Sequence, residues 1–457
     1  MKPTASIPTS RSELRSLLAL AIPVVIDHIG TMSMGMVDTI LVGRLGAREL
    51  AAVGIGSAVY FAFMTFCFGV LSAVSATVAH AAGARDDDEV GRTLTQGAWM
   101  AIALAAAAML YVSFAGPILT LLDQPAEIIP LTERYLGMLS IGIPATLLNA
   151  MLRSYAVGLG QARVPMMISI GGALTNLGLA TLLVFGAGPI APMGVAGAGL
   201  ATATTYWLMC AASLVFVRRA RHFANYRAKR SIAPDRLRLV RLIRLGVPIG
   251  IGTSLETAVF AFTTIMMGRL GTHVVAAHQV AINIAATTFM VPMGISIATS
   301  TRVGHAAGAG DMPAAARAGW TGIGTGVGFM ACTAVAFLLF RHQIVALYTR
   351  DAQVAALAAV LLMIGGAFQI VDGLQVTAQG ALRGLKDTTR PMLVNLLAYW
   401  LVGFPAGLWL GFEAGLRGPG LWWGLTFGLS VAGVLHVLRF RRLVAGPRRA
   451  DASTGAS

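Results

Sequence analysis

The most constraining feature of this sequence is a series of twelve apolar runs, each long enough to cross a lipid bilayer as a helix. One crossing needs about 20 predominantly apolar residues. In lipid every backbone polar group must be satisfied within the protein, which favours helices. The approximate limits of the runs are 17–43, 51–80, 94–122, 131–158, 165–188, 193–217, 243–270, 276–304, 318–348, 353–382, 391–413 and 419–440.

Composition supports the same conclusion. Only 12% of the residues are charged and 56% are hydrophobic, whereas a soluble domain carries about 25% charged residues. We therefore expect an all-α integral membrane protein with twelve transmembrane helices.

The distribution of lysine and arginine predicts the orientation of these helices. If the N-terminus is cytoplasmic, most of the 34 basic residues lie at cytoplasmic helix ends, and the exceptions are Arg44, Arg48, Arg134, Arg269, Arg341, Arg350 and Arg417. Such an excess marks cytoplasmic loops. The sequence thus predicts a multi-pass protein of the plasma (inner) membrane with both termini cytoplasmic.

The net charge of +15 follows from this topology. Membrane lipid is the expected partner of the basic loops, because anionic headgroups attract them. No basic patch alternates with aromatic residues as a base-stacking surface would, so we expect no nucleic-acid partner.

One long polar stretch, from Arg218 to Arg244, lies near the middle of the chain and indicates a division into two halves. We expect a monomer. The expected parts are a cytoplasmic N-terminal tail (1–16), an N-terminal six-helix bundle (17–217), a basic cytoplasmic linker (218–242), a C-terminal six-helix bundle (243–440) and a cytoplasmic C-terminal tail (441–457).

The two halves are related by an internal repeat with an offset of 225 residues. The matching pairs are Pro23 with Pro248, Gly43 with Gly268 in the motif GRLG, His80 with His305 in the motif HAAGA and, after one residue of drift, Pro165 with Pro391. Six spans separate equivalent helices, so equivalent helices cross in the same direction. Two parallel six-helix repeats are typical of transporters that bind substrate between their halves, although a channel or a membrane enzyme can also arise by duplication.

Four carboxylates interrupt the apolar runs. Asp27 and Asp38 lie in the first run, Glu256 in the seventh and Asp372 in the tenth. A charged side chain at the bilayer centre costs roughly 2.5–3.5 kcal/mol on insertion scales. Such a residue marks an ion pathway or a buried pair, so these four are candidate functional residues.

The carboxylates break the repeat. The positions equivalent to Asp38, Glu256 and Asp372 in the other half are Thr263, Thr31 and Thr146. The helical scaffold is therefore duplicated, whereas the ionisable groups are not. This difference is expected if the two halves have different functional roles. A carboxylate withdrawn from water binds a proton more readily, and carboxylate and hydroxyl oxygens also suit a hard cation, so both chemistries stay open.

Structural roles compete with these functional ones. Asp38 could pair with an arginine near the interface, Asp372 could anchor hydrogen bonds, and Asp27 could make a polar contact facing the cytoplasm. Two uncharged polar residues of the eighth run, Gln279 and Asn283, are candidate supporting groups in a cavity.

Enzymatic motifs are absent from the sequence. It contains no HExxH, GxSxG or Walker pattern, so we expect no enzymatic activity, no bound metal at a permanent site and no cofactor other than a coupling ion. The glycine-rich segment GVAGAGLATA is best explained by small residues at helix contacts.

Three ordered stretches resemble the multidrug and toxin extrusion (MATE) transporters, nearest their NorM-like branch. They are LAIPVVIDHIGTMSMGMVDTILVGRLGARELAAVGIG in the first two runs, GVPIGIGTSLETAVFAFTTIMMGRLGTHVVAAHQVAIN in the seventh and eighth, and QIVDGLQVTAQGALRGLKDTTRPM in the tenth. The resemblance extends from about residue 17 to 439.

The resemblance implies a fold and an activity. Two helical bundles would form a V-shaped central cavity, and cationic, amphipathic small molecules (drugs or toxins) would be exported by alternating access in exchange for Na⁺ or H⁺. The residues matching the family's cation site in the C-terminal half, where Na⁺ would bind transiently, are Glu256 and Asp372. Those matching the site in the N-terminal half are Asp38, Asn176 and Thr202.

Two departures from the family pattern weaken these sites. Ala180 stands where the family often has Asn or Asp, and Phe368 replaces an aromatic residue that carries a hydroxyl. Both changes favour H⁺ or a Na⁺ site with fewer oxygens.

The same resemblance leaves an alternative function open. Flippases of lipid-linked precursors and other exporters of the superfamily share this fold, but the flippases usually carry a cationic central cavity. The acidic groups within the spans of this chain favour cationic cargo instead.

Overall fold

The computed structural model describes residues 10–186, 188–189, 191–220, 223, 225–226 and 233–445. In these residues eleven helices are long and apolar enough to cross a membrane, and a bent pair brings the number of spans to twelve. The predicted all-α, twelve-helix membrane fold is confirmed. The ends of the predicted tails, 1–9 and 446–457, and residues 221–222, 224 and 227–232 of the predicted linker lie outside the described residues.

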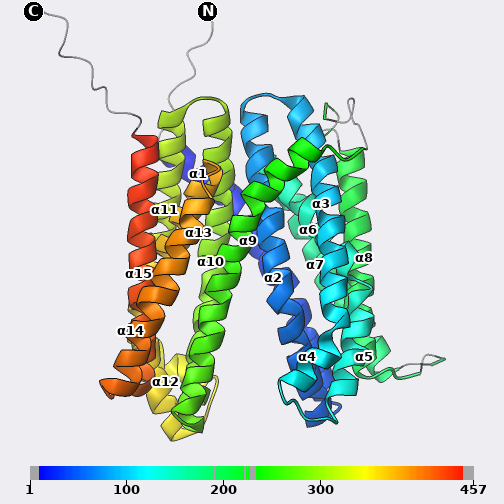
Figure 1. Ribbon diagram of the computed structural model, residues 1–457, viewed down its shortest axis with the longest axis vertical. Helices are drawn as coiled ribbons and strands as arrows, with labels where there is room; N and C mark the ends of the chain where they lie inside the picture. The colour runs from blue at the N-terminus through cyan, green and yellow to red at the C-terminus, as the bar shows by residue number, and fades with distance from the viewer. Residues whose placement is uncertain are drawn as a thin grey trace, which may run out of the picture. The chain divides into compact units, whose positions relative to one another are not determined.

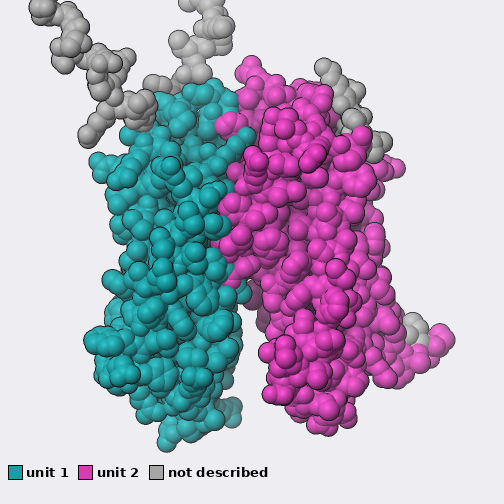
Figure 2. Space-filling view, in the orientation of Figure 1, with its two compact units in different colours: residues 1–18, 255–457 teal, residues 19–254 magenta. Residues whose placement is uncertain are grey.

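The chain forms two compact units, which Figure 2 colours separately. Unit 2 comprises Ala19–Ser254, and unit 1 comprises Met1–Leu18 with Leu255–Ser457. Two helices at equivalent positions of the repeat, α1 (Ser10–Gly43) and α9 (Arg236–Arg269), each contribute residues to both units. The V-shaped cavity between the halves stays a prediction.

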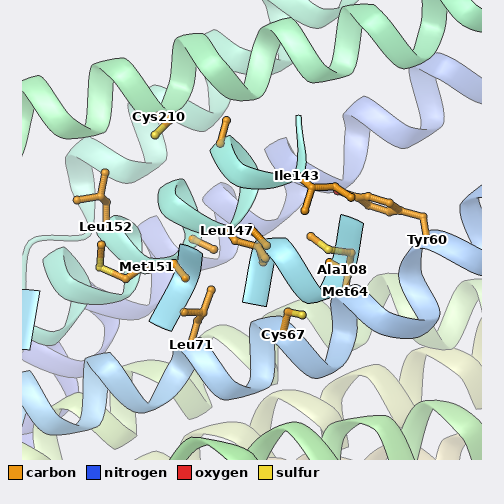
Figure 3. Packing of buried hydrophobic residues seen from close by; sticks show 14 of the residues in the cluster. Tyr60, Met64, Cys67, Leu71, Ala108, Ile143, Leu147, Met151, Leu152 and Cys210 are labelled. Atoms are coloured by element: carbon orange, nitrogen blue, oxygen red, sulfur yellow. The ribbon is translucent and has the colours of Figure 1, made fainter. Parts of the chain in front are cut away.

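Unit 2 is built from the later part of α1, the first part of α9 and seven helices between them. These are α2 (Ala47–Gly83), α3 (Asp87–Ser113), α4 (Ala115–Leu121), α5 (Ile129–Ser140), α6 (Ile143–Gly158), α7 (Arg163–Phe185) and α8 (Val195–Arg219). Figure 3 shows part of the core of unit 2, where Met64 and Leu71 of α2 pack with Leu147 and Met151 of α6.

A break between α5 and α6 explains why one span consists of two helices. The two helices are bent by 49°, and α6 begins with Pro144 in its first turn. Proline has no backbone N–H, so it fits the start of a helix and disrupts its interior. The carbonyl of Ile141 at the break accepts a hydrogen bond from the Trp207 indole at 3.0 Å.

Unit 1 contains the remaining spans (Figure 1). Its helices after α9 are α10 (Thr272–Gly308), α11 (Met312–Ala346), α12 (Ala352–Gly384), α13 (Thr389–Asn395), the π-helical segment η2 (Leu396–Gly403), α14 (Phe404–Leu408), the π-helical segment η3 (Trp409–Glu413) and α15 (Arg417–Val444). The four pieces from α13 to η3 form one span, Thr389–Glu413. π-helical turns are rare and occur often at functional sites.

The repeat extends to the turns that join equivalent helices. Asp86 caps α3 by accepting a hydrogen bond from the backbone N–H of Glu89 at 2.9 Å. Asp311, which lies 225 residues later, caps α11 in the same way through Ala314 at 2.8 Å. Such caps satisfy backbone donors that a helix start leaves free.

The first residues of α1 are held in unit 1 by an ion pair. Both carboxylate oxygens of Glu13 accept hydrogen bonds from Arg302 of α10, at 2.8 and 2.6 Å. Glu13 is buried, whereas the Arg302 side chain is one-third exposed. Paired, two-bond contacts of this kind are the strongest between arginine and carboxylate.

The Arg302→Leu substitution is expected to lower the stability of the folded protein by about 2 kcal/mol, because it leaves the Glu13 carboxylate buried without a partner. The measurement is thermal unfolding in detergent. The double variant Glu13→Gln/Arg302→Leu should recover part of the loss, and equal stability of wild type and Arg302→Leu would contradict the expectation.

Candidate functional site

In unit 2 three helices bring the predicted residues Asp38, Asn176 and Thr202 into direct contact. The Thr202 hydroxyl donates a hydrogen bond to Asp38 Oδ2 at 2.7 Å and accepts one from Asn176 Nδ2 at 2.9 Å. All three side chains are buried, and Asp38 Oδ1 and Asn176 Oδ1 have no hydrogen-bond partner among the described residues. The free oxygen of the Asp38 carboxylate and the free amide oxygen of Asn176 could together bind a proton or a small cation.

Ala180 lies one helical turn from Asn176 and is completely buried. It belongs to an apolar cluster with Leu41 and Ala201, against which Val37 and Leu183 pack. Apolar contacts therefore occupy the place where the family often has another polar side chain, and the polar group of unit 2 consists of its three connected residues.

Asp27 forms a separate ion pair. Its Oδ2 accepts a hydrogen bond from Arg153 of α6 at 2.9 Å, and only 5% of the Asp27 side chain is exposed. Of the two roles that the sequence left open, this geometry supports a structural polar contact between α1 and α6.

In unit 1 Glu256 lines a small cavity. The other lining residues are Val259 and Phe260 of α9, Tyr399 and Gly403 of η2, and Leu425, Gly428 and Leu429 of α15. The Trp400 indole donates a hydrogen bond to the carbonyl of Leu255 at 3.2 Å. This bond fixes the backbone of α9 against η2 immediately before Glu256.

Asp372 of α12 belongs to the same polar group. It is 4% exposed, its Oδ1 has no hydrogen-bond partner, and it interacts electrostatically with Glu256. The structure thus brings the two predicted carboxylates of the C-terminal half together. Glu256 also interacts electrostatically with Arg383. One arginine does not neutralise two carboxylates, so the arrangement favours uptake of a cation or a proton.

Tyr399 supplies an aromatic hydroxyl that the sequence analysis missed. Phe368 packs edge-on against Phe260 and Trp422, with ring centroids 6.0 and 5.5 Å apart, and contributes no oxygen. Within the described residues the hydroxyl of Tyr399 makes no hydrogen bond of normal geometry. It lies beside the Gln375 side chain and interacts electrostatically with both Glu256 and Asp372. An aromatic hydroxyl therefore faces the carboxylates from η2 instead of from α12.

Gln279 and Asn283 lie one turn apart on α10. The amide of Gln279 donates a hydrogen bond to Asn283 Oδ1 at 3.3 Å, and both side chains are exposed. They do not line the cavity that contains Glu256. Their predicted supporting role in a larger cavity stays a prediction.

Several buried polar residues near Asp372 were missed by sequence reasoning. Gln375, Asn395 and Tyr399 are each at most 3% exposed and have unpartnered polar atoms. A signal for Gln375 was present, because it follows Asp372 by three residues and lies on the same helix face. Asn395 and Tyr399 lie in the apolar span 391–413, where no neighbouring candidate residue one turn away indicates that they belong to a site.

The fold and these two polar groups define a class: a repeat-built, multi-pass helical membrane protein with acidic groups buried in each half, as in secondary transporters. A family model for MatE matches residues 23–182 and 248–409. The chain belongs to this family, the multidrug and toxin extrusion transporters.

Individual relatives match over most of their length. The chain is 39% identical over 457 residues to "Multidrug resistance protein NorM" of Burkholderia vietnamiensis, covering 97% of this chain and 98% of that one. It is 37% identical to "Multidrug resistance protein PmpM" of Pseudomonas aeruginosa, covering 90% and 86%. The crystal structure of the eukaryotic MATE transporter AtDTX14 superposes with a TM-score of 0.86 at 22% identity, covering 95% and 98%.

Proposed function

We propose that this protein is a secondary active antiporter that exports cationic, amphipathic drugs or toxins in exchange for Na⁺ or H⁺ by alternating access. The observation that carries the proposal is the polar group of Glu256, Asp372 and Tyr399, in which Asp372 is buried and its Oδ1 has no hydrogen-bond partner among the described residues. The printed names of the relatives from Burkholderia and Pseudomonas, which are multidrug resistance proteins, support the same class of cargo.

The coupling follows from the charges. A cation or proton that neutralises Glu256 and Asp372 removes the cost of burying them, so it stabilises the packing in which they are enclosed. A ligand shifts an equilibrium only by binding one state better than the other. Cargo that binds the opposite state is then released as the ion binds, and the ion gradient drives export.

The orientation and location belong to the same proposal. The excess of Lys and Arg in the loops supports an orientation with both termini in the cytoplasm, and the proposed location is the plasma (inner) membrane. In this orientation the end of α12 that carries Arg383 and Lys386 faces the cytoplasm.

Export of lipid-linked precursors is not favoured. An anionic pyrophosphate cargo needs unpaired cationic groups within the membrane, whereas Arg153 is paired with Asp27 and the remaining carboxylates midway along the spans are Asp38, Glu256 and Asp372. The polarity of these groups suits a cation.

The Asp38→Asn substitution is expected to reduce efflux of a cationic dye about tenfold, because an uncharged amide cannot bind or release a cation as a carboxylate does. Thr202→Val should reduce efflux less, since Asp38 stays in place. The measurement is dye efflux from overexpressing cells at equal membrane abundance, with the exposed Asp123→Asn as the control. Wild-type efflux by Asp38→Asn would exclude the polar group of unit 2 from coupling.

A further inference from the structure

A stripe of polar residues runs along one face of α12. Because its members are spaced by three or four residues, they lie above one another on the helix. The stripe comprises Gln369, Asp372, Gln375, Gln379 and Arg383, and Lys386 follows in the turn after the helix. It leads from the carboxylate group toward the end of the helix at Gly384.

The central residue of the stripe is buried beside the Tyr399 hydroxyl. Gln375 is 0% exposed, and neither its amide nitrogen nor its amide oxygen has a hydrogen-bond partner among the described residues. An amide buried in this way lowers the stability of the folded protein. Natural proteins rarely retain that cost without a ligand, an ion or water at the site.

A second helix adds polar groups beside the stripe. Asn395 is 0% exposed, and both polar atoms of its side chain are unpartnered. Asn395 immediately precedes η2, and Tyr399 lies one turn further along with its hydroxyl toward the carboxylates. The π-helical turn widens the helix where these two side chains enter the interior.

A third helix continues the polar groups toward the helix end. His436 of α15 is 1% exposed, its Nδ1 is unpartnered, and its Nε2 lies 3.4 Å from the Pro391 carbonyl. One turn earlier, a Cβ on Gly433 would lie 3.5 Å from the backbone nitrogen of Gln375, so α15 and α12 are in close contact here. His436 interacts electrostatically with Asp387, which pairs with Arg439 at 2.8 Å just beyond α12.

The other half of the protein provides an internal comparison. With the offset of 226 that holds in this region, Asp372, Gln375 and Gln379 correspond to Thr146, Asn149 and Arg153 of α6. The Thr146 hydroxyl donates to the Gly142 carbonyl, Asn149 accepts from Ser213 at 2.7 Å, and Arg153 pairs with Asp27. The polar residues of α6 are therefore paired, whereas Gln375 is not.

We propose that the polar groups from Asp372 through Gln375, Asn395 and His436 to Asp387 form the path by which the coupling cation leaves the carboxylates for the cytoplasmic face. This proposal rests on the proposed function. Unpartnered amide, hydroxyl and imidazole groups hydrogen-bond water or coordinate a cation in passage, and they carry no charge that would retain it. Arg383, which follows Gln379 by one turn on α12, interacts electrostatically with Glu256.

Removing the path without disturbing the carboxylates tests the proposal. Gln375→Met and Asn395→Leu conserve shape, and Gln375→Met also removes the polar contact of Gln375 with the Tyr399 hydroxyl. Each is expected to lower cation-driven flux of a cationic dye into proteoliposomes about tenfold. Dye affinity and displacement of the dye by NaCl or by acid should stay at wild-type values, and thermal stability should be unchanged or higher.

Thr377→Val is the matched control, because Thr377 lies on the other side of α12 and its hydroxyl donates to the Gly373 carbonyl of its own helix. It should retain wild-type flux. Wild-type flux in both Gln375→Met and Asn395→Leu would overturn the path, and so would a loss of flux matched by an equal loss of cation displacement. Failure of the proposed function would appear differently, as cation-driven flux that persists in Glu256→Gln.

Discussion

Asp372→Asn and Glu256→Gln are each expected to reduce cation-driven efflux of a cationic dye by about a hundredfold, because the ion then no longer distinguishes the two states of the transporter. Both substitutions conserve shape and remove one negative charge. The measurement is the initial rate of dye efflux at equal membrane abundance. It should be made with a Na⁺ gradient and with a pH gradient in turn.

The control for this experiment is Asp123→Asn. Asp123 is exposed in the turn after α4, and it has a left-handed backbone, φ 50°, which asparagine tolerates. The control should transport like wild type. Full activity in both Asp372→Asn and Glu256→Gln would remove unit 1 from the coupling mechanism.

Gly424→Ala is expected to destabilise the protein by about 3 kcal/mol or more, because the added methyl group has no space. A Cβ on Gly424 would lie 2.2 Å from the Cα of Gly407 and 2.8 Å from the carbonyl oxygen of Gly403. These are backbone atoms, so no side-chain rotation relieves the contact. α15 must then move away from the span that carries Asn395 and Tyr399.

Gly328→Ala in α11 is the matched control, since a Cβ there would contact nothing within 4 Å. Alanine in a helix interior is favoured over glycine by about 0.5–1 kcal/mol, so this variant should be as stable as wild type or more stable. Thermal unfolding in detergent compares the two. Equal stabilities of Gly424→Ala and Gly328→Ala would show that the close contact of α15 with Gly403 and Gly407 does not contribute to the stability of the protein.

Much of the fold could be predicted because each membrane span appears in the sequence as a long apolar run. The expected run 353–382 is observed as Ala352–Gly384, and 391–413 as Thr389–Glu413. Length and apolarity alone determine these limits. The break between α5 and α6 was not expected, because the run 131–158 has the length and apolarity of a single helix.

The candidate site was predicted in part, for a physical reason. Carboxylates in lipid are conspicuous because their free-energy cost is high, so Asp38, Glu256 and Asp372 were identified. In the structure Asp38 and Asp372 are buried, and Glu256 is partly buried and interacts with Asp372. Tyr399 and Asn395 were missed because tyrosine and asparagine are unremarkable in a single sequence. Their importance depends on which helices pack against α12, and that is a property of the tertiary structure.

The central claim is that a cation gradient drives export through buried carboxylates. The most direct measurement is dye flux in proteoliposomes, driven separately by a Na⁺ gradient and by a pH gradient. The account predicts accumulation of dye against its own gradient with at least one of them, and loss of that accumulation when the gradient is collapsed or when Asp372 is replaced by Asn. Dye movement that is only downhill and indifferent to both gradients would contradict it.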